Sequence, residues 1–244
     1  AKRSGNTNGI TTPIVWGGTL CGNKKHDDLN KETTQGNTLG ADFFYNDNSL
    51  LSASYYNIVS NYGHLDDKKN KNIRVVKNHV FSVGGVYKIS KVFLAKTIFS
   101  LNTGNSSKNP YHKKKSEGLT LTTSASYYKD LIAGLAVVQS AGVTHSRVVD
   151  LENIYKKKSI TKFFADAKFS LKQGFEILGA KVSPFANFGY KYTKDKSKLH
   201  SHHYDLGTGL LLEYGRFKCT VKKNFEFKKK YNDFENNFGI TVAL

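Results

Sequence analysis

The sequence lacks methionine, has only three prolines and two cysteines, and contains no long apolar run. The longest apolar run, residues 131–138, is far shorter than the roughly 20 residues that a membrane-spanning helix needs, so a helical membrane protein is excluded. Two cysteines in 244 residues do not make a disulfide framework. We expect Cys21 and Cys219 near opposite ends of strands that are not neighbours, too far apart for a bridge.

Acidic residues are also scarce, with 19 Asp and Glu against 37 Lys and Arg and a formal net charge of +18. Because the lysines are spread over many polar segments, a nucleic-acid-binding face is disfavoured. Solvated loops are the simple interpretation, and a dedicated anion-binding role is the alternative. The start AKRSG has no initiator residue, signal region or cleavage-site pattern, which indicates a mature form or a fragment.

What is present is strand periodicity. In GNTLGADFFYNDNSLLSASYYNIVS, residues 36–60, apolar and polar side chains alternate on both sides of Asn46, Asp47 and Asn48. These three residues tolerate turn conformations, so the stretch is predicted to be an antiparallel hairpin.

The same unit recurs along the chain, and the connections alternate between short turns and long basic loops. About twelve strands are predicted, each of about 9 to 12 residues, a length that crosses a bilayer when the strand is tilted. Residues 1–12 are predicted to be a polar linker and residues 13–244 one domain. The predicted strands are the two in the hairpin and residues 14–21, 79–88, 91–103, 118–128, 131–144, 160–171, 177–192, 204–213, 217–227 and 236–244.

Charges occur in the middle of the polar faces of these strands, and unpaired charges cannot be packed in a small dry core. They can line a wet lumen, so the sequence predicts an all-β fold, a closed antiparallel up-and-down transmembrane β-barrel. A soluble β-sandwich remains the alternative. The tyrosines expected in an interfacial girdle are Tyr45, Tyr55, Tyr87, Tyr127, Tyr128, Tyr190 and Tyr192. The predicted lumen-lining residues are Asp42, Lys96, Asp166, Lys168, Lys181, Asp205, Lys218, Lys222 and Glu226.

Several segments together resemble the C-terminal translocator domain of type V autotransporters of Gram-negative bacteria. The segments are Val15–Gly17, TLGADFFYNDNSLLSASYYN, SPFANFGYKYT, LGTGLLLEY and the terminal NNFGITVAL. The terminal segment is also similar to the last-strand signal of outer-membrane barrels, with Asn237, Gly239, Val242 and Leu244 at its positions. Leu244 departs from the family, which normally ends in Phe or Trp.

The resemblance implies an outer-membrane barrel with both termini periplasmic, which anchors and helps to export an N-terminal passenger domain. The implied partners are outer-membrane lipid and lipopolysaccharide, the barrel-assembly machinery and the covalently linked passenger, with no nucleic acid. The family's pore-spanning helix is not visible in residues 1–12. No cofactor, no metal and no catalytic residues are expected.

Two other functions remain open, a stand-alone porin-like or adhesin-like barrel and an outer-membrane barrel hydrolase. A hydrolase needs a convergent Ser and His or carboxylates with His. The candidates are His145 beside Ser146, and the cluster of His200, His202 and His203 near Asp205. Adjacent strand residues point to opposite faces, which argues against the first pair.

Overall fold

The computed structural model describes residues 13–25, 30–65, 71–109, 112–131, 134–151, 157–171, 174–195, 200–228 and 232–243. The predicted linker, residues 1–12, therefore lies outside the described residues. The described residues contain no helix long and apolar enough to cross a membrane. The strands are β1 (Ile14–Lys25), β2 (Asn30–Asn46), β3 (Ser49–Leu65), β4 (Lys71–Lys88), β5 (Phe93–Asn109), β6 (His112–Asp130), β7 (Leu135–Asp150), β8 (Lys157–Leu171), β9 (Phe175–Ile177), β10 (Ala180–Asp195), β11 (His200–Tyr214), β12 (Phe217–Lys228) and β13 (Asn232–Ala243).

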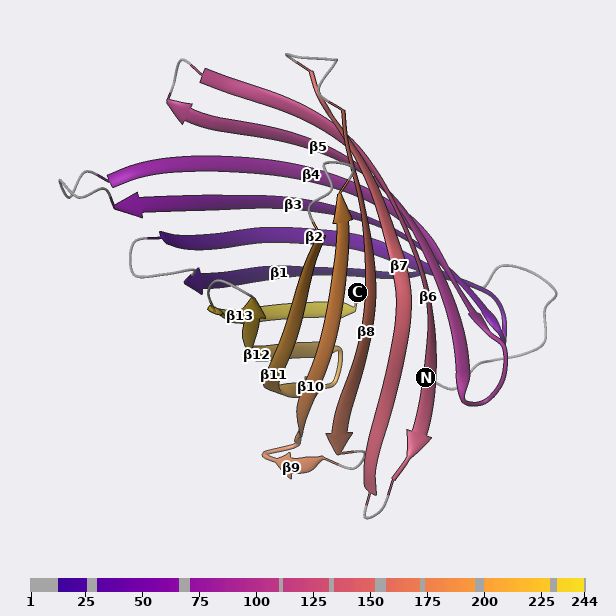
Figure 1. Cartoon of the computed structure of the whole chain (residues 1–244). Coiled ribbons are helices and arrows are strands. Elements are labelled where there is room, and N and C mark those ends of the chain that lie inside the picture. Colours follow the sequence, from indigo (N-terminus) through magenta and orange to yellow (C-terminus); the bar gives the residue numbers. More distant parts are fainter. Residues whose placement is uncertain are drawn as a thin grey trace.

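Twelve long strands form a closed antiparallel barrel, as the sequence predicted (Figure 1). Each pairs with its neighbours along the chain, and β1 pairs with β13 from Trp16 opposite Ala243 to Lys25 opposite Phe234. The short β9 forms a hairpin with β10 beyond the end of its pairing with β8. The sheet therefore has no open edge along the ring.

The two faces of the wall differ in chemistry because successive side chains point to opposite sides. Large apolar side chains are exposed on the outer face, with Phe81 54% and Leu121 47% exposed. Small hydroxyl residues hydrogen-bond across strands on the inner face, as in Ser82 with Ser100 at 2.8 Å and Thr122 with Thr144 at 3.0 Å. This distribution inverts the pattern of a soluble barrel and argues against the sandwich alternative.

One aromatic side chain lies flat against the inner wall. The ring of Trp16 on β1 covers Gly40, its Cα partner on β2. A Cβ added at position 40 would overlap the ring, so glycine is required here for the close approach.

The strands extend beyond the predicted ranges at their long-loop ends, and several segments interpreted as loops are paired backbone. Residues 71–78, for example, continue β4 and pair with β3. The sequence prediction stopped where apolar alternation stopped. Backbone pairing continues farther because strands outside a bilayer can present polar side chains to water on both faces.

Two placements of individual residues were wrong. Tyr128 is on the inner-face register, opposite Val138, and its hydroxyl donates to Asp130, so it is not part of an outer girdle. Cys21 and Cys219 are free, but they lie at similar heights, because β13 pairs them with Phe238 and Ile240. The error came from ending the first strand at Cys21, which made a mid-strand residue look like a rim residue.

Candidate lumen site

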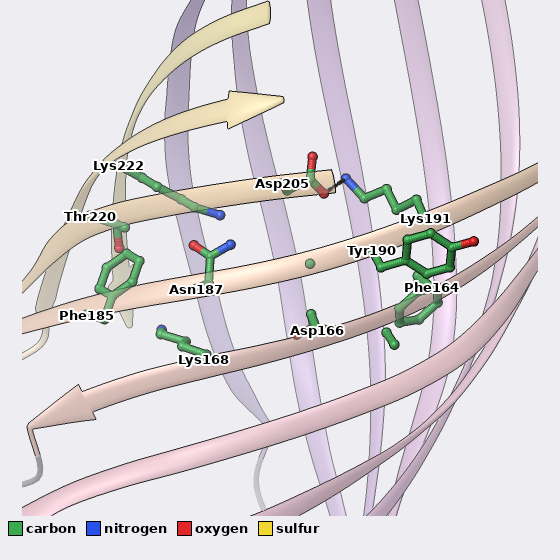
Figure 2. A pocket seen from close by; sticks show the side chains of 12 residues that line it. Phe164, Asp166, Lys168, Phe185, Asn187, Tyr190, Lys191, Asp205, Thr220 and Lys222 are labelled. Carbon is green, nitrogen blue, oxygen red and sulfur yellow. Dashed lines mark ion pairs between the residues drawn. The ribbon is translucent and has the colours of Figure 1, made fainter. Parts of the chain in front are cut away.

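A cavity of about 390 Å³ lies against the inner wall formed by β8, β10, β11 and β12 (Figure 2). The residues that line it include three lysines, two aspartates and an asparagine. They are Asp166, Lys168, Asn187, Lys191, Asp205 and Lys222. Four of these six had been predicted as lumen-lining from the sequence, and Asn187 and Lys191 lie on the same face of β10.

In the strand register, all nine residues that were predicted to line the lumen lie on the inner face of the wall. Asp166 pairs with Gly189, which pairs with Asp205, which pairs with Glu226. Asp42 lies opposite Ser52, and Lys96 opposite Ser124, within the rows of hydroxyl residues. Lys168 is opposite Asn187, Lys181 and Lys218 are opposite Glu213, and Lys222 is opposite Gly209.

Most of these charges have a specific partner. Lys191 Nζ is 2.6 Å from Asp205 Oδ2, and Ser52 donates to Asp42 Oδ1 at 2.7 Å. Lys168 Nζ lies 4.2 Å from the centre of the Phe185 ring, a cation–π contact. Pairing of opposite charges along the wall offsets their desolvation and keeps polar groups facing the lumen.

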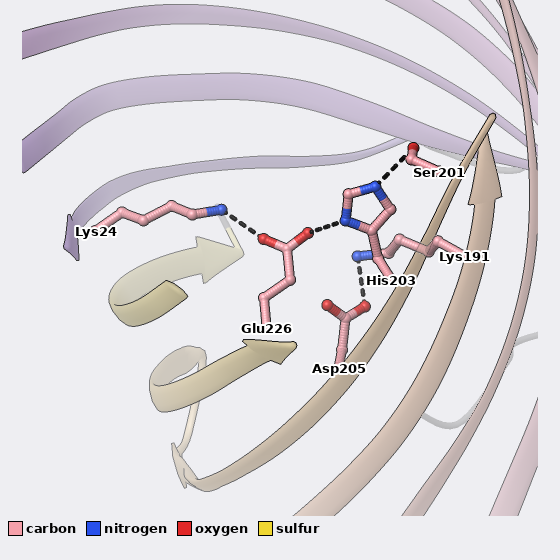
Figure 3. A network of polar contacts seen from close by, with 6 residues as sticks. All are labelled: Lys24, Lys191, Ser201, His203, Asp205 and Glu226. Carbon is pink, nitrogen blue, oxygen red and sulfur yellow. Dashed lines mark hydrogen bonds and ion pairs between the residues drawn. The ribbon is translucent and has the colours of Figure 1, made fainter. Parts of the chain in front are cut away.

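A second polar network crosses the junction between the chain ends (Figure 3). Glu226 on β12 accepts a hydrogen bond from Lys24 Nζ on β1 at 2.7 Å, and its other oxygen is 3.2 Å from His203 Nδ1. His203 Nε2 is 2.9 Å from Ser201 Oγ. Because β13 lies between β1 and β12, the Lys24–Glu226 pair links strands that are not hydrogen-bonded to each other.

Sequence reasoning missed Lys24 and His203 as parts of this network. Lys24 had been assigned to a loop, although it continues the alternation of Trp16 and Leu20 on β1. Extending that alternation would have found it. His203 had been considered only for catalysis or metal binding.

Of the other candidate histidines, His145 and His202 face outward, whereas Ser146 and Asp205, the residues named beside them, face inward, and the side chain of His200 lies outside the described part of the structure. His145 faces outward and is 3.0 Å from Thr161 Oγ1, whereas Ser146 faces inward toward Thr120. His202 contacts the Tyr190 hydroxyl at 2.8 Å on the outer face. Within the described ranges, no group of three His, Cys, Asp or Glu residues could hold a metal ion.

The predicted assembly signal lies on β13, which closes the ring. Asn237 is opposite Gly22 and Lys222, and Gly239 is opposite Leu20 and Thr220. Val242 is on the other face, opposite Gly17 and Phe217. Leu244 lies outside the described residues.

The fold and its charged lumen define a β-barrel of the transmembrane class. No family model matches the chain, and no curated protein matches it. Among solved structures, it is similar to the β domain of the Bordetella autotransporter BrkA, with a TM-score of 0.75 and 12% identity over 96% of this chain and 100% of that one. It is also similar to the translocator domain of autotransporter NalP from Neisseria meningitidis, with a TM-score of 0.69 and 12% identity over 97% and 89%.

An outer membrane channel from Pseudomonas putida F1 has a TM-score of 0.62 and 8% identity over the full length of both chains. The resemblance stated from the sequence is thus confirmed at the level of fold: the chain has the barrel fold of autotransporter translocator domains.

Proposed function

We propose that this chain is an outer-membrane barrel that anchors an N-terminal passenger domain and helps to export it. The observation that carries the proposal is the closed ring with an exposed apolar outer face and a charged inner face. A bilayer accepts such a ring because every strand edge is paired and apolar side chains face lipid. The similarity to two translocator domains favours export over other barrel functions.

The proposed mechanism is a conduit rather than a reaction. The inner charges, including Asp42, Asp166 and Lys168, hydrate the lumen and contact the segment that links barrel and passenger. An equally good role for each is to stabilise the wall through pairs such as Lys191–Asp205. The assembly machinery is the proposed partner of β13, and an even number of spanning strands supports both termini in the periplasm.

A reporter fusion tests this function. A signal peptide and a compact reporter are joined to the N-terminus of the chain and expressed in a Gram-negative host. We expect the reporter to become accessible to external protease in intact cells. The control is the same fusion with Gly239→Asp in the closing strand. A reporter that stays protected while the barrel is inserted and folded would contradict export.

A stand-alone channel is the second candidate, supported by the similar fold of the Pseudomonas channel. The coding sequence upstream of Ala1 separates the two candidates. Several hundred further codons in frame would support export, and a signal peptide directly before Ala1 would support the channel.

The observation that favours a hydrolase is a chain of contacts from Ser201 through His203 to Glu226. It resembles the arrangement of a nucleophile, a general base and an orienting carboxylate. Lys24 binds the same carboxylate, and the cavity beside Lys168 is lined by none of these three residues. Ester hydrolysis by the folded barrel that is abolished by Ser201→Ala would establish this function. Covalent labelling of Ser201 by a fluorophosphonate would serve as the second readout.

A further inference from the structure

The outer face has an apolar band that ends at a distinct boundary on the side away from the short turns. On β8, the exposed Phe169 near the short turn lies eight residues from Thr161, which is opposite His145 of β7. Val182 and Tyr190 on β10 have the same separation. Eight residues span about 26 Å along a strand and about 20 Å along the membrane normal at a tilt near 40°. His145 and Tyr190 therefore lie near the far edge of a band that is about 25 Å tall in such barrels.

Basic side chains gather at this edge on β7, β10 and β11, with Thr161 of β8 between them. Thr161 on β8 is the Cα partner of both His145 on β7 and Lys194 on β10. Arg147 lies two residues beyond His145 on the same face, and His202 on β11 is diagonal to Lys194. We call this group, His145, Arg147, Thr161, Lys194 and His202, the basic outer patch. Its two permanent cations are exposed.

Aromatic side chains lie directly below the patch, on the side of the apolar band. Tyr192 stacks on Phe163, with ring centroids 6.1 Å apart, and Tyr190 packs against Tyr204 at 5.2 Å. The Tyr190 hydroxyl is 2.8 Å from His202 Nδ1. When the phenol donates this hydrogen bond, the proton of His202 is on Nε2, which leaves that nitrogen as a donor.

The charge of the surroundings favours an anion. Among the described outward-facing side chains of the long strands, the acidic residue is Glu117, on β6, where it is diagonal to Arg147. Lys and Arg side chains outnumber it on this face. A ligand that fits must therefore carry negative charge on a polar head and an apolar part that follows the aromatic band.

We propose that the basic outer patch binds the phosphate of a lipid in the outer leaflet, with the acyl chains along Phe163, Tyr190 and Tyr192. The inference rests on the proposed outer-membrane setting, in which the long loops lie on the side of the cell exterior. Arg147 and Lys194 supply the charge, and His202 adds a hydrogen-bond donor. A lipid phosphate fits better than free phosphate because only a lipid also covers the apolar rings below.

The test measures binding of fluorescent diphosphoryl lipid A to the purified, folded chain in dodecylmaltoside micelles. The variant is Arg147→Gln with Lys194→Gln, and the control with the same loss of charge is Lys77→Gln with Lys223→Gln on other parts of the outer face. Each cation near a lipid surface contributes about fivefold in affinity. We expect roughly 25-fold weaker binding for the patch variant and less than a twofold change for the control.

Equal affinities of the two double variants, whether weakened together or unchanged, would overturn the proposal, because binding would then not depend on this patch. Displacement of lipid A by millimolar inorganic phosphate would also overturn it, since it would indicate a site for free phosphate. The charge-conserving variant Arg147→Lys with Lys194→Arg is expected to retain binding, and heat-modifiable migration verifies the fold of each variant. Because the assay uses the isolated barrel, its result is independent of passenger export.

Discussion

At the scale of single residues, large side chains cover glycines at several positions on the inner wall. Trp16 over Gly40 and Phe185 over Gly209 are two such contacts, one near the chain ends and one beside the lumen cavity. They take the place of a continuous hydrophobic core, which the described part of the barrel hardly has, since its buried apolar residues are Ala136, Val137 and Phe185.

Gly40→Ala is therefore expected to destabilise the barrel by about 1–3 kcal/mol, the usual cost of overpacking, because the Trp16 ring must move. Urea titration of the refolded protein in detergent, followed by heat-modifiable migration, measures the effect. Gly17→Ala is the matched control. The nearest heavy atom to its added Cβ is 3.6 Å away, an ordinary contact. Equal unfolding midpoints for the two variants would exclude the proposed overlap.

Glu226→Gln is expected to lower the stability by about 1–2 kcal/mol, in the range of hydrogen bonds to charged groups. The carboxylate is only 18% exposed and joins Lys24 to His203. Glu213→Gln is the control, because its partner Lys218 is 61% exposed and such pairs contribute little. Urea midpoints at low and high salt provide the comparison. A greater loss for Glu213→Gln would contradict the importance of the link across β13.

At the scale of elements, strand faces and turn positions could be predicted because alternation is a local property of the sequence. Asn46–Asn48 turn as expected, with the Asn48 amide donating to Asn46 Oδ1 at 2.9 Å. The strand ends were missed because backbone pairing continues where apolar alternation stops. The contact between Lys24 and Glu226 could not be predicted because it depends on ring closure, which brings β1 and β12, far apart in sequence, to the two sides of β13.

The closing strand has its own test. If Leu244 completes the assembly signal, Leu244→Asp removes the apolar terminus and is expected to reduce outer-membrane insertion several-fold. Insertion is measured by recovery of folded barrel in the membrane fraction. Asn48→Asp, a charge change in the β2–β3 turn, is the control. Normal insertion of the Leu244→Asp variant would show that Leu244 is not part of the assembly signal.

At the scale of the whole molecule, the ring should behave as one cooperative unit in detergent. The unheated protein is expected to migrate faster on a gel than the boiled protein, because a closed barrel resists detergent unfolding and stays compact. Identical migration before and after boiling would contradict a membrane barrel. The chain with residues 232–244 deleted, which cannot close the ring, is expected to lose the difference.

The pairing of Trp16 with Ala243 joins residues at the two ends of the chain. Contacts between residues so distant in sequence form late, because a long loop must be ordered before they are made. The ring therefore cannot close before β13 has been synthesised. Until then, the edge of β1 that pairs with β13 in the folded barrel has no partner strand from this chain, and its backbone N–H and C=O groups are open to pairing with other strands.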